Sequence, residues 1–226
     1  MRKKLALICL LFLILFLVTN IGKPLIAKEK QQVIMLFVEG MSFHDLEQLK
    51  KFSTVDKWLD DAGAGALSIR TPGSRTAANG YLLMGSGGQA LYSDKSGTGY
   101  HPYEALSSRE TAGERAQELG SDQVQEVARS SIIFPGIFRL LADNREKPYS
   151  AQIGLLGTVL AANNIQIASY GNGDYEDTRQ RHAVLFAMDQ QGRVPTGDIS
   201  TKSMELLRGY PYGIKTNYAY LLEKIN

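Results

Sequence analysis

The clearest feature in the pattern of hydrophobic and polar positions is an unbroken apolar run from Val33 to Val38, which is followed by Glu39-Gly40. A run without alternating polar residues is typical of a strand buried on both faces, as in a parallel sheet covered by helices. Open α/β sheets place their ligands at the carboxyl ends of such strands. The pattern therefore predicts a central strand that delivers Glu39 to a crevice.

Two short helices and a second strand are predicted next. Ser42 and Asp45 form a capping-box pattern at the start of a helix over residues 43–49, and Ser53 begins another. Residues 65–71 alternate as a strand does. This opening order of strand, helices and strand favours a parallel pairing and an α/β fold.

The same patterns predict the rest of the chain. Further helices are expected over residues 77–84, 108–119, 137–142, 150–160 and 216–225, and further strands over residues 132–134, 165–170, 182–188 and 193–199. Residues 91–103 are rich in Gly, Ser, Tyr and Pro, which indicates a loop excursion over about 91–120. We expect one α/β domain over residues 31–226, with a largely parallel sheet flanked by helices.

The N-terminus differs in kind from the rest of the chain. Three basic residues, Arg2 to Lys4, precede fourteen residues from Leu5 to Val18 that carry no charge. A basic region followed by an apolar region of this length is typical of a secretory signal. A buried core helix is the alternative, but the segment has no polar face. Residues 1–30 are therefore predicted to be a signal peptide or a membrane anchor.

The sequence leaves cleavage and anchoring as alternatives. Cleavage near Ala27 would release a secreted protein, although Leu25 is not the small residue preferred two positions earlier. If the apolar segment continues through Gly22, it approaches the roughly 17–25 residues that span a bilayer. The basic residues would then keep the N-terminus in the cytoplasm and place the domain outside, anchored to the cell membrane.

Composition and charge exclude several kinds of site and binding partner. The 226 residues, 44% hydrophobic, suffice for one domain with its own core. The single cysteine, Cys9, lies in the apolar segment, so the domain has no disulfide and no cysteine zinc site. Residues 1–30 hold six basic residues and one acidic residue; removing these from the chain's 25 and 23 leaves 19 basic and 22 acidic residues. This balance predicts no nucleic-acid partner.

Two places could carry chemistry in one crevice. Glu39, at a strand terminus, could hold a divalent cation. A hydroxyl in Ser74-Arg75-Thr76, at the start of a helix, could be activated as a nucleophile beside that cation, where the helix N-terminus also favours phosphate or sulfate. The alternatives are that Glu39 is a solvated loop acid and that Thr76 only caps the helix.

The order of these landmarks resembles the N-terminal half of the alkaline phosphatase superfamily, which includes phosphodiesterases, sulfatases and phosphopentomutases. The resemblance covers residues 32–90, and a weaker similarity extends to about residue 200. In the family, an acid after the first strand binds metal, and a Ser or Thr at a helix start is the nucleophile. In its phosphodiesterase branch, an Asn three residues later helps to hold the phosphoryl oxygens.

The resemblance implies roles for three residues. Thr76 would be the nucleophile, Asn79 would hold phosphoryl oxygens, and Glu39, in place of the family's Asp, would bind a divalent metal such as zinc or manganese. The predicted helix after Thr76 is about one residue shorter than in the family, which leaves Ser74 and Arg75 as alternatives for the nucleophile position.

The number of metal ligands argues against a complete catalytic site. A two-metal site needs about six protein ligands, several of them His in this family. The sequence has three His (His44, His101 and His182) and no Asp-x-x-x-His motif. Asp174, after the strand predicted over residues 165–170, is either a further crevice acid or a turn residue.

The sequence thus predicts an extracytoplasmic, alkaline-phosphatase-like protein, degenerate or truncated, that acts as a non-catalytic binding or scaffold module of the cell envelope. The alternative is a metal-dependent hydrolase of phosphate or sulfate esters with Thr76 as its nucleophile. Whether the protein is an enzyme stays open at this point. The sequence identifies neither a substrate nor a protein partner.

Overall fold

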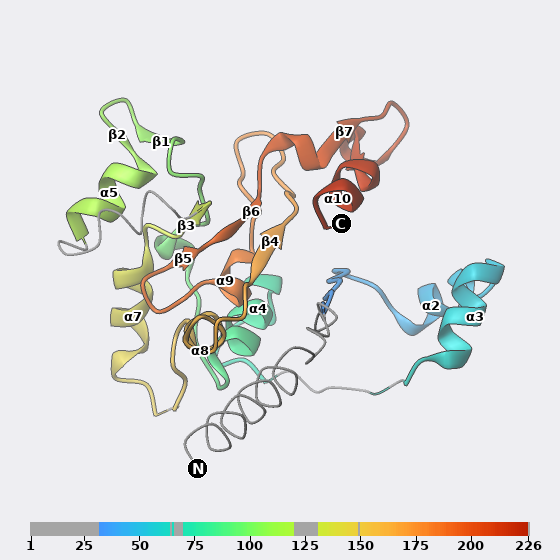
Figure 1. Ribbon diagram of the computed structural model, residues 1–226, viewed down its shortest axis with the longest axis horizontal. Coiled ribbons are helices and arrows are strands. Elements are labelled where there is room, and N and C mark those ends of the chain that lie inside the picture. The colour runs from blue at the N-terminus through green and yellow to red at the C-terminus, as the bar shows by residue number, and fades with distance from the viewer. Residues whose placement is uncertain (1–31, 64, 66–69, 120–130, 149, 226) are drawn as a thin grey trace, which may run out of the picture. The chain divides into compact units, whose positions relative to one another are not determined.

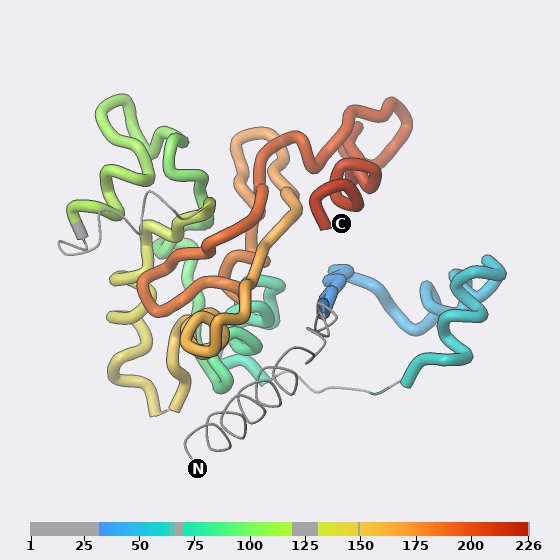
Figure 2. Tube along the Cα trace, viewed as in Figure 1, coloured from blue at the N-terminus to red at the C-terminus, as the bar shows by residue number. Residues whose placement is uncertain are grey.

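The structure is a computed structural model of the 226-residue chain, and it describes residues 32–63, 65, 70–119, 131–148 and 150–225 (Figures 1 and 2). The predicted signal or anchor over residues 1–30 lies outside these ranges. Within them, no helix combines the length and the apolar character needed to cross a bilayer.

The chain divides into two compact units, residues 1–57 and 58–226, which are considered separately. The first contains helix α2, Phe43–Leu49, and the start of helix α3, Ser53–Asp61. The predicted capping box is confirmed: Ser42 Oγ accepts from the Asp45 N–H, and the Asp45 carboxylate accepts from the Ser42 N–H at 2.8 Å. Helix α2 therefore begins where its capping signal predicts, whereas Ser53 is itself the first residue of α3.

The buried central strand predicted from Val33 to Val38 is wrong. These residues belong to no strand ladder in the described part of the chain, and Val33 and Leu36 are 87% and 81% exposed. An unbroken apolar run indicates that both faces suit burial, but a strand forms only where a neighbouring strand supplies the hydrogen bonds. The second predicted strand, over residues 65–71, falls largely on residues outside the described ranges.

The core of the second unit lies among helices. The α-helices that the described residues place wholly within it are α4 Ala77–Ser86, α5 Ala112–Leu119, α7 Ile137–Arg145, α8 Leu155–Ala162, α9 Val184–Ala187 and α10 Tyr218–Ile225. Helix α4 packs against α8 and α9 (Figure 1). The largest buried side chains include Leu82, Phe134, Leu140, Leu185 and Met188. Removing these apolar groups from water is the main favourable term that holds the unit together.

The strands of the described residues pair only in twos. The pairs are β1 Ala105–Ser107 with β2 Glu110–Thr111, β3 Ile132–Ile133 with β5 Arg193–Val194, β4 Ala168–Tyr170 with β6 Thr196–Asp198, and β7 Met204–Leu206 with β8 Ile214–Thr216. Only the β4–β6 pair is parallel. The protein therefore mixes helices and sheets, as an α/β chain does, but these residues form no large parallel sheet.

The segment predicted as one strand over residues 193–199 explains part of this difference. Pro195 divides it into β5 and β6, which pair with β3 and β4. Proline has no N–H to donate to a strand ladder, so a break at this position is expected. Residue alternation could not show that the two halves have different partners.

The strand predicted over residues 182–188 is also wrong, because Val184–Ala187 form helix α9. Val184, Leu185 and Ala187 are buried, and a short run that is apolar on all sides suits a buried helix as well as a strand. The helix predicted from Ser150 begins later, at Leu155, after Gly154 with a φ of +74°. A turn with this left-handed residue occupies the expected first turn of the helix.

The segment from 91 to 119 is attached to the second unit by backbone hydrogen bonds. Tyr100 and Ile133 exchange N–H···O bonds of 2.8 Å in both directions. Farther along, Ala112 N–H donates to the Glu104 carbonyl, and the Ala112 side chain is fully buried. These contacts place Tyr100 beside β3, and in this segment His101 is buried and Glu104 half-buried.

Candidate functional site

Thr76 and Asn79 form the N-terminal cap of helix α4. Thr76 is exposed, with an extended backbone (φ −103°, ψ 158°), and its Oγ1 accepts from the Asn79 N–H at 3.3 Å. Asn79 Nδ2 also donates to Thr76 Oγ1, at 3.1 Å. The structure therefore brings these two predicted site residues together, in the geometry of an ordinary helix cap.

Both the nitrogen and the oxygen of the Asn79 side-chain amide form hydrogen bonds within the protein. It is 3% exposed, its Nδ2 donates to the Ser74 carbonyl at 3.0 Å, and its Oδ1 accepts from the Tyr92 N–H at 2.8 Å. Together with the bond to Thr76, these contacts join the turn before α4 to the loop after it. An amide engaged in this way has little remaining capacity to bind phosphoryl oxygens.

Glu39, the predicted metal ligand, lies in the first unit, in an exposed turn with Gly40, whose φ is +72°. Thr76 and Asn79 lie in the second unit, so their pairing with Glu39 in one crevice stays a prediction. Ser74 and Arg75, the alternatives for the nucleophile position, are exposed in the turn before α4.

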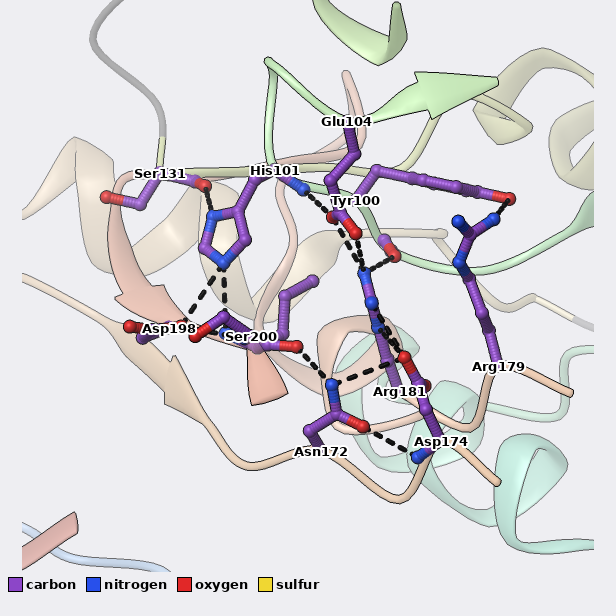
Figure 3. Close-up of polar contacts among 12 residues, drawn as sticks. Tyr100, His101, Glu104, Ser131, Asn172, Asp174, Arg179, Arg181, Asp198 and Ser200 are labelled. Carbon is purple, nitrogen blue, oxygen red and sulfur yellow. Dashed lines mark hydrogen bonds and ion pairs between the residues drawn. The ribbon is translucent and has the colours of Figure 1, made fainter. Parts of the chain in front are cut away.

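A group of polar side chains lies near the carboxyl ends of the parallel strands β4 and β6 (Figure 3). We define the polar cluster by its six central members: His101, Glu104, Asn172, Asp174, Arg181 and Asp198. Parallel pairing places the loops that follow both strands at one edge, and the Gly171 N–H donates to the Asp198 carbonyl at 3.1 Å. Open α/β sheets commonly place functional residues at this edge.

Arg181 is the centre of the polar cluster. Its guanidinium Nη1 donates to both carboxylate oxygens of Glu104, at 2.9 and 2.7 Å, and its Nη2 lies 2.6 Å from Asp174 Oδ2. The residue is 6% exposed. Burial disfavours its charge, but hydrogen bonds and opposite charges from the two carboxylates outweigh this effect and raise the pKa of Arg181.

Asn172 and Asp174 fix the loop after β4. Asn172 Oδ1 accepts from the Asp174 N–H, and Asn172 Nδ2 donates to the Ile199 carbonyl, both at 2.6 Å. Asp174 Oδ1 accepts from the Gln180 N–H at 2.9 Å. Asp174 therefore has a structural role in the loop after β4, and its carboxylate is neutralised by Arg181.

Asp198 connects the polar cluster to the C-terminal helix. One oxygen accepts from the Ser200 N–H at 2.7 Å, and the other accepts from the Tyr220 hydroxyl of α10. Burial opposes ionisation, but the hydrogen bonds from Ser200 and Tyr220 and the charge of His101 outweigh it and lower the pKa of Asp198 to about 2. The same bond raises the pKa of the Tyr220 phenol to about 12.

Within the described residues, the donors of a metal site do not come together. Among the described residues, no group of three or more His, Cys, Asp or Glu side chains lies close enough to hold an ion. His44 is exposed on α2, and His182 contacts the Tyr92 ring edge-on, with the ring centres 6.3 Å apart. The Glu104 and Asp174 carboxylates are already paired with an arginine.

Sequence reasoning missed Arg181, Glu104 and Asp198, and it treated His101 as an isolated loop histidine. Arg181 stands in a polar stretch with other charged residues, and its partner Glu104 is 77 positions away. Nothing local distinguishes such a buried arginine from a solvated one. Asp174 carried the one usable signal, an acid directly after a predicted strand.

Comparisons with protein-family models, curated proteins and solved structures found no match to the chain. The similarity to the alkaline phosphatase superfamily thus stays a prediction from the residues 32–90, and the function is argued from the geometry.

Proposed function

We propose that this chain is a non-catalytic binding or scaffold module of the cell envelope with a degenerate alkaline-phosphatase-like core. In this proposal, residues 1–30 keep the domain outside the cytoplasm, either as an anchor or as a cleaved signal. The parallel pair β4–β6 and the helices α4, α8 and α9 represent the parallel sheet and helical layer of that core.

Asn79 is the observation that carries the non-catalytic part of the proposal. A residue that holds a phosphoryl group needs free donors, whereas the Asn79 amide donates to Ser74 and Thr76. The donor set points the same way, because the described residues gather no metal-binding group. The helix start that would hold a nucleophile therefore serves the fold.

The ester-hydrolase alternative is favoured by one specific feature of Thr76. Its hydroxyl is exposed at the N-terminus of the ten-residue helix α4, and both of its hydrogen bonds to Asn79 use the oxygen as acceptor. A helix N-terminus favours a phosphate or sulfate group, and a hydroxyl there can act as a nucleophile once a base or metal activates it. This reading requires Glu39 and further ligands to bind zinc or manganese.

Metal analysis and turnover by the purified full chain separate the two readings. We expect no stoichiometric zinc or manganese, and hydrolysis of aryl phosphate esters and diesters no faster in the wild type than in Thr76→Ala. The Thr76→Ala variant should still lose about 1 kcal/mol of unfolding free energy, because it removes the helix cap, whereas Thr76→Ser should keep most of it. Bound metal together with turnover abolished by Thr76→Ala would establish the hydrolase instead.

The location of the domain has its own test. In the proposed arrangement, the chain is found in the membrane fraction or in the medium, and a protease added outside intact cells reaches the domain. Protection from that protease, together with recovery in the cytoplasmic fraction, would contradict an envelope role.

A further inference from the structure

His101 lies where the loop before β1 meets the carboxyl end of β6, and it is 7% exposed. Its Nδ1 is 2.7 Å from the Ser131 carbonyl oxygen. A carbonyl oxygen only accepts hydrogen bonds, so Nδ1 carries a proton whether the ring is neutral or charged. In the neutral ring, the other nitrogen, Nε2, is therefore bare.

Nε2 has two neighbours with opposite requirements. The Ile199 backbone nitrogen and the Asp198 Oδ1 atom each lie 3.3 Å from it. The Ile199 N–H only donates, whereas the carboxylate only accepts. A bare Nε2 accepts from Ile199 and presents its lone pair to Asp198, and a protonated Nε2 donates to Asp198 and opposes the Ile199 N–H. One nitrogen cannot satisfy both neighbours in a single protonation state.

The carboxylate stays charged while the imidazole changes. The pKa of Asp198 lies at about 2, far below the range of about pH 5 to 8 in which histidine side chains ordinarily change charge. Its position is fixed from two sides by the Ser200 N–H and the Tyr220 hydroxyl. Protonation of His101 therefore meets a fixed negative charge.

The other groups around the ring leave this contact dominant. Glu104 Oε2 accepts from the His101 backbone N–H at 2.6 Å, but Arg181 neutralises that carboxylate. The Tyr103 ring stacks on the imidazole, with the ring centres 5.2 Å apart, and contributes no charge near neutral pH. Asp198 is thus the unneutralised acid that faces the nitrogen gaining the proton.

We propose that His101 is a pH-dependent latch that exchanges hydrogen-bond partners at the carboxyl end of β6. When the ring is neutral, it holds the Ile199 N–H; when the ring is protonated, it forms an ion pair with Asp198. The Asp198 carboxylate also binds Tyr220 of α10, and the Asp198 backbone carbonyl accepts from Gly171 after β4, so the exchange takes place where these segments meet. The latch is independent of whether the chain hydrolyses esters.

Nuclear magnetic resonance of the full chain in detergent micelles, between pH 4.5 and 8.5, tests the latch. At the upper end, the His101 ring should carry its proton on Nδ1. As the ring gains its second proton, the Ile199 amide signal should move as its hydrogen bond is lost, with the same midpoint. Asp198→Asn should lower that midpoint, because an opposite charge is removed from the ring.

Asp143→Asn is the matched control, since it removes a carboxylate that pairs with Arg139 rather than with the imidazole. In this variant, the midpoint of the His101 ring should equal that of the wild type. His101→Gln should make the Ile199 amide signal independent of pH, which keeps the test valid even if Asp198→Asn does not fold. A proton on Nε2 at pH 8.5, an Ile199 signal that ignores the ring, or a pH-dependent Ile199 signal in His101→Gln would each overturn the proposal.

Discussion

Asn79 joins three segments of the chain through one buried amide: the turn before α4, the first turn of that helix and the loop at Tyr92. The same residue type at the same spacing would suit a phosphoryl-binding site. What distinguishes the two roles is where the donors point, because a structural amide directs them at carbonyl and hydroxyl oxygens of its own protein.

Replacing Asn79 with Ala should lower the free energy of unfolding by about 1–3 kcal/mol, because the part-buried Tyr92 N–H and the Ser74 carbonyl lose their partner. Urea unfolding of the full chain measures this change. In the control Asn163→Ala, the lost bond to the Val159 carbonyl is exposed, and the change should stay within about 0.5 kcal/mol. Equal losses in both variants would show that Asn79 is not a structural centre.

Arg181 is a second residue whose effect depends on burial. Arg181→Met leaves the Glu104 and Asp174 carboxylates without their counter-charge, and we expect a loss of about 3–5 kcal/mol. Arg139 forms a similar ion pair with Asp143 but is 54% exposed, so Arg139→Met should cost about 0–1 kcal/mol. Denaturant unfolding compares the two variants, and similar losses would contradict a buried, structural role for Arg181.

At the scale of elements, glycines determine how closely helix α8 approaches its neighbour. A Cβ added to Gly157 would lie 2.5 Å from the Met188 carbonyl oxygen, and one added to Gly154 would lie 2.3 Å from the Asp189 carbonyl. At both positions the neighbouring backbone lies closer than any side chain would allow. Gly80, in α4, has open space around its Cβ position.

The same substitution should therefore have opposite effects in the two helices. Gly80→Ala should raise the free energy of unfolding by about 0.5–1 kcal/mol, because alanine has the higher helix propensity. Gly157→Ala should lower it by about 1–3 kcal/mol, because the added methyl group clashes with rigid backbone. Thermal or urea unfolding gives both signs, and stabilisation by Gly157→Ala would show that α8 can move away from Met188.

At the scale of the whole molecule, the bond between Asp198 and Tyr220 attaches the C-terminal helix α10 to the carboxyl end of β6. The bond needs an ionised carboxylate and a protonated phenol. The pKa of Asp198 is lowered to about 2, and that of Tyr220 is raised to about 12. Both shifts favour the hydrogen-bonded pair over a wide pH range.

Stability should therefore decline at both extremes of pH. The contribution of Asp198 is fully present above about pH 4 and is lost as pH falls towards 2, since the folded pKa lies below the unfolded value. The contribution of Tyr220 is fully present below about pH 10 and is lost as pH rises towards 12, since its folded pKa lies above the unfolded value. Unfolding free energies measured across pH test both limbs.

Tyr220→Phe is the informative variant for this profile. It removes the phenol, so the alkaline decline assigned to Tyr220 should disappear, and the acid decline should become smaller as Asp198 loses a donor. An unchanged alkaline limb in Tyr220→Phe would assign that decline to other groups.

The sequence by itself determined the features that depend on neighbours within a few positions. The capping box at Ser42 and the cap at Thr76 follow from side chains that reach backbone groups three residues away. The helices α4, α7 and α10 were predicted as helices, each with one end that differs from the observed one by two or three residues. The pairing of Thr76 with Asn79 was also predictable, because the two residues are three positions apart at the start of one helix.

Tertiary structure alone decided which distant segments meet. Strand pairs depend on hydrogen-bond partners that lie far along the chain, so alternation could not show that Val33–Val38 would join no ladder or that β5 and β6 would pair separately. The polar cluster has the same origin. Arg181 contacts Glu104, which is 77 positions away, and His101 contacts Asp198, which is 97 positions away. A buried charge must be paired inside the protein, and only the folded chain brings these partners together.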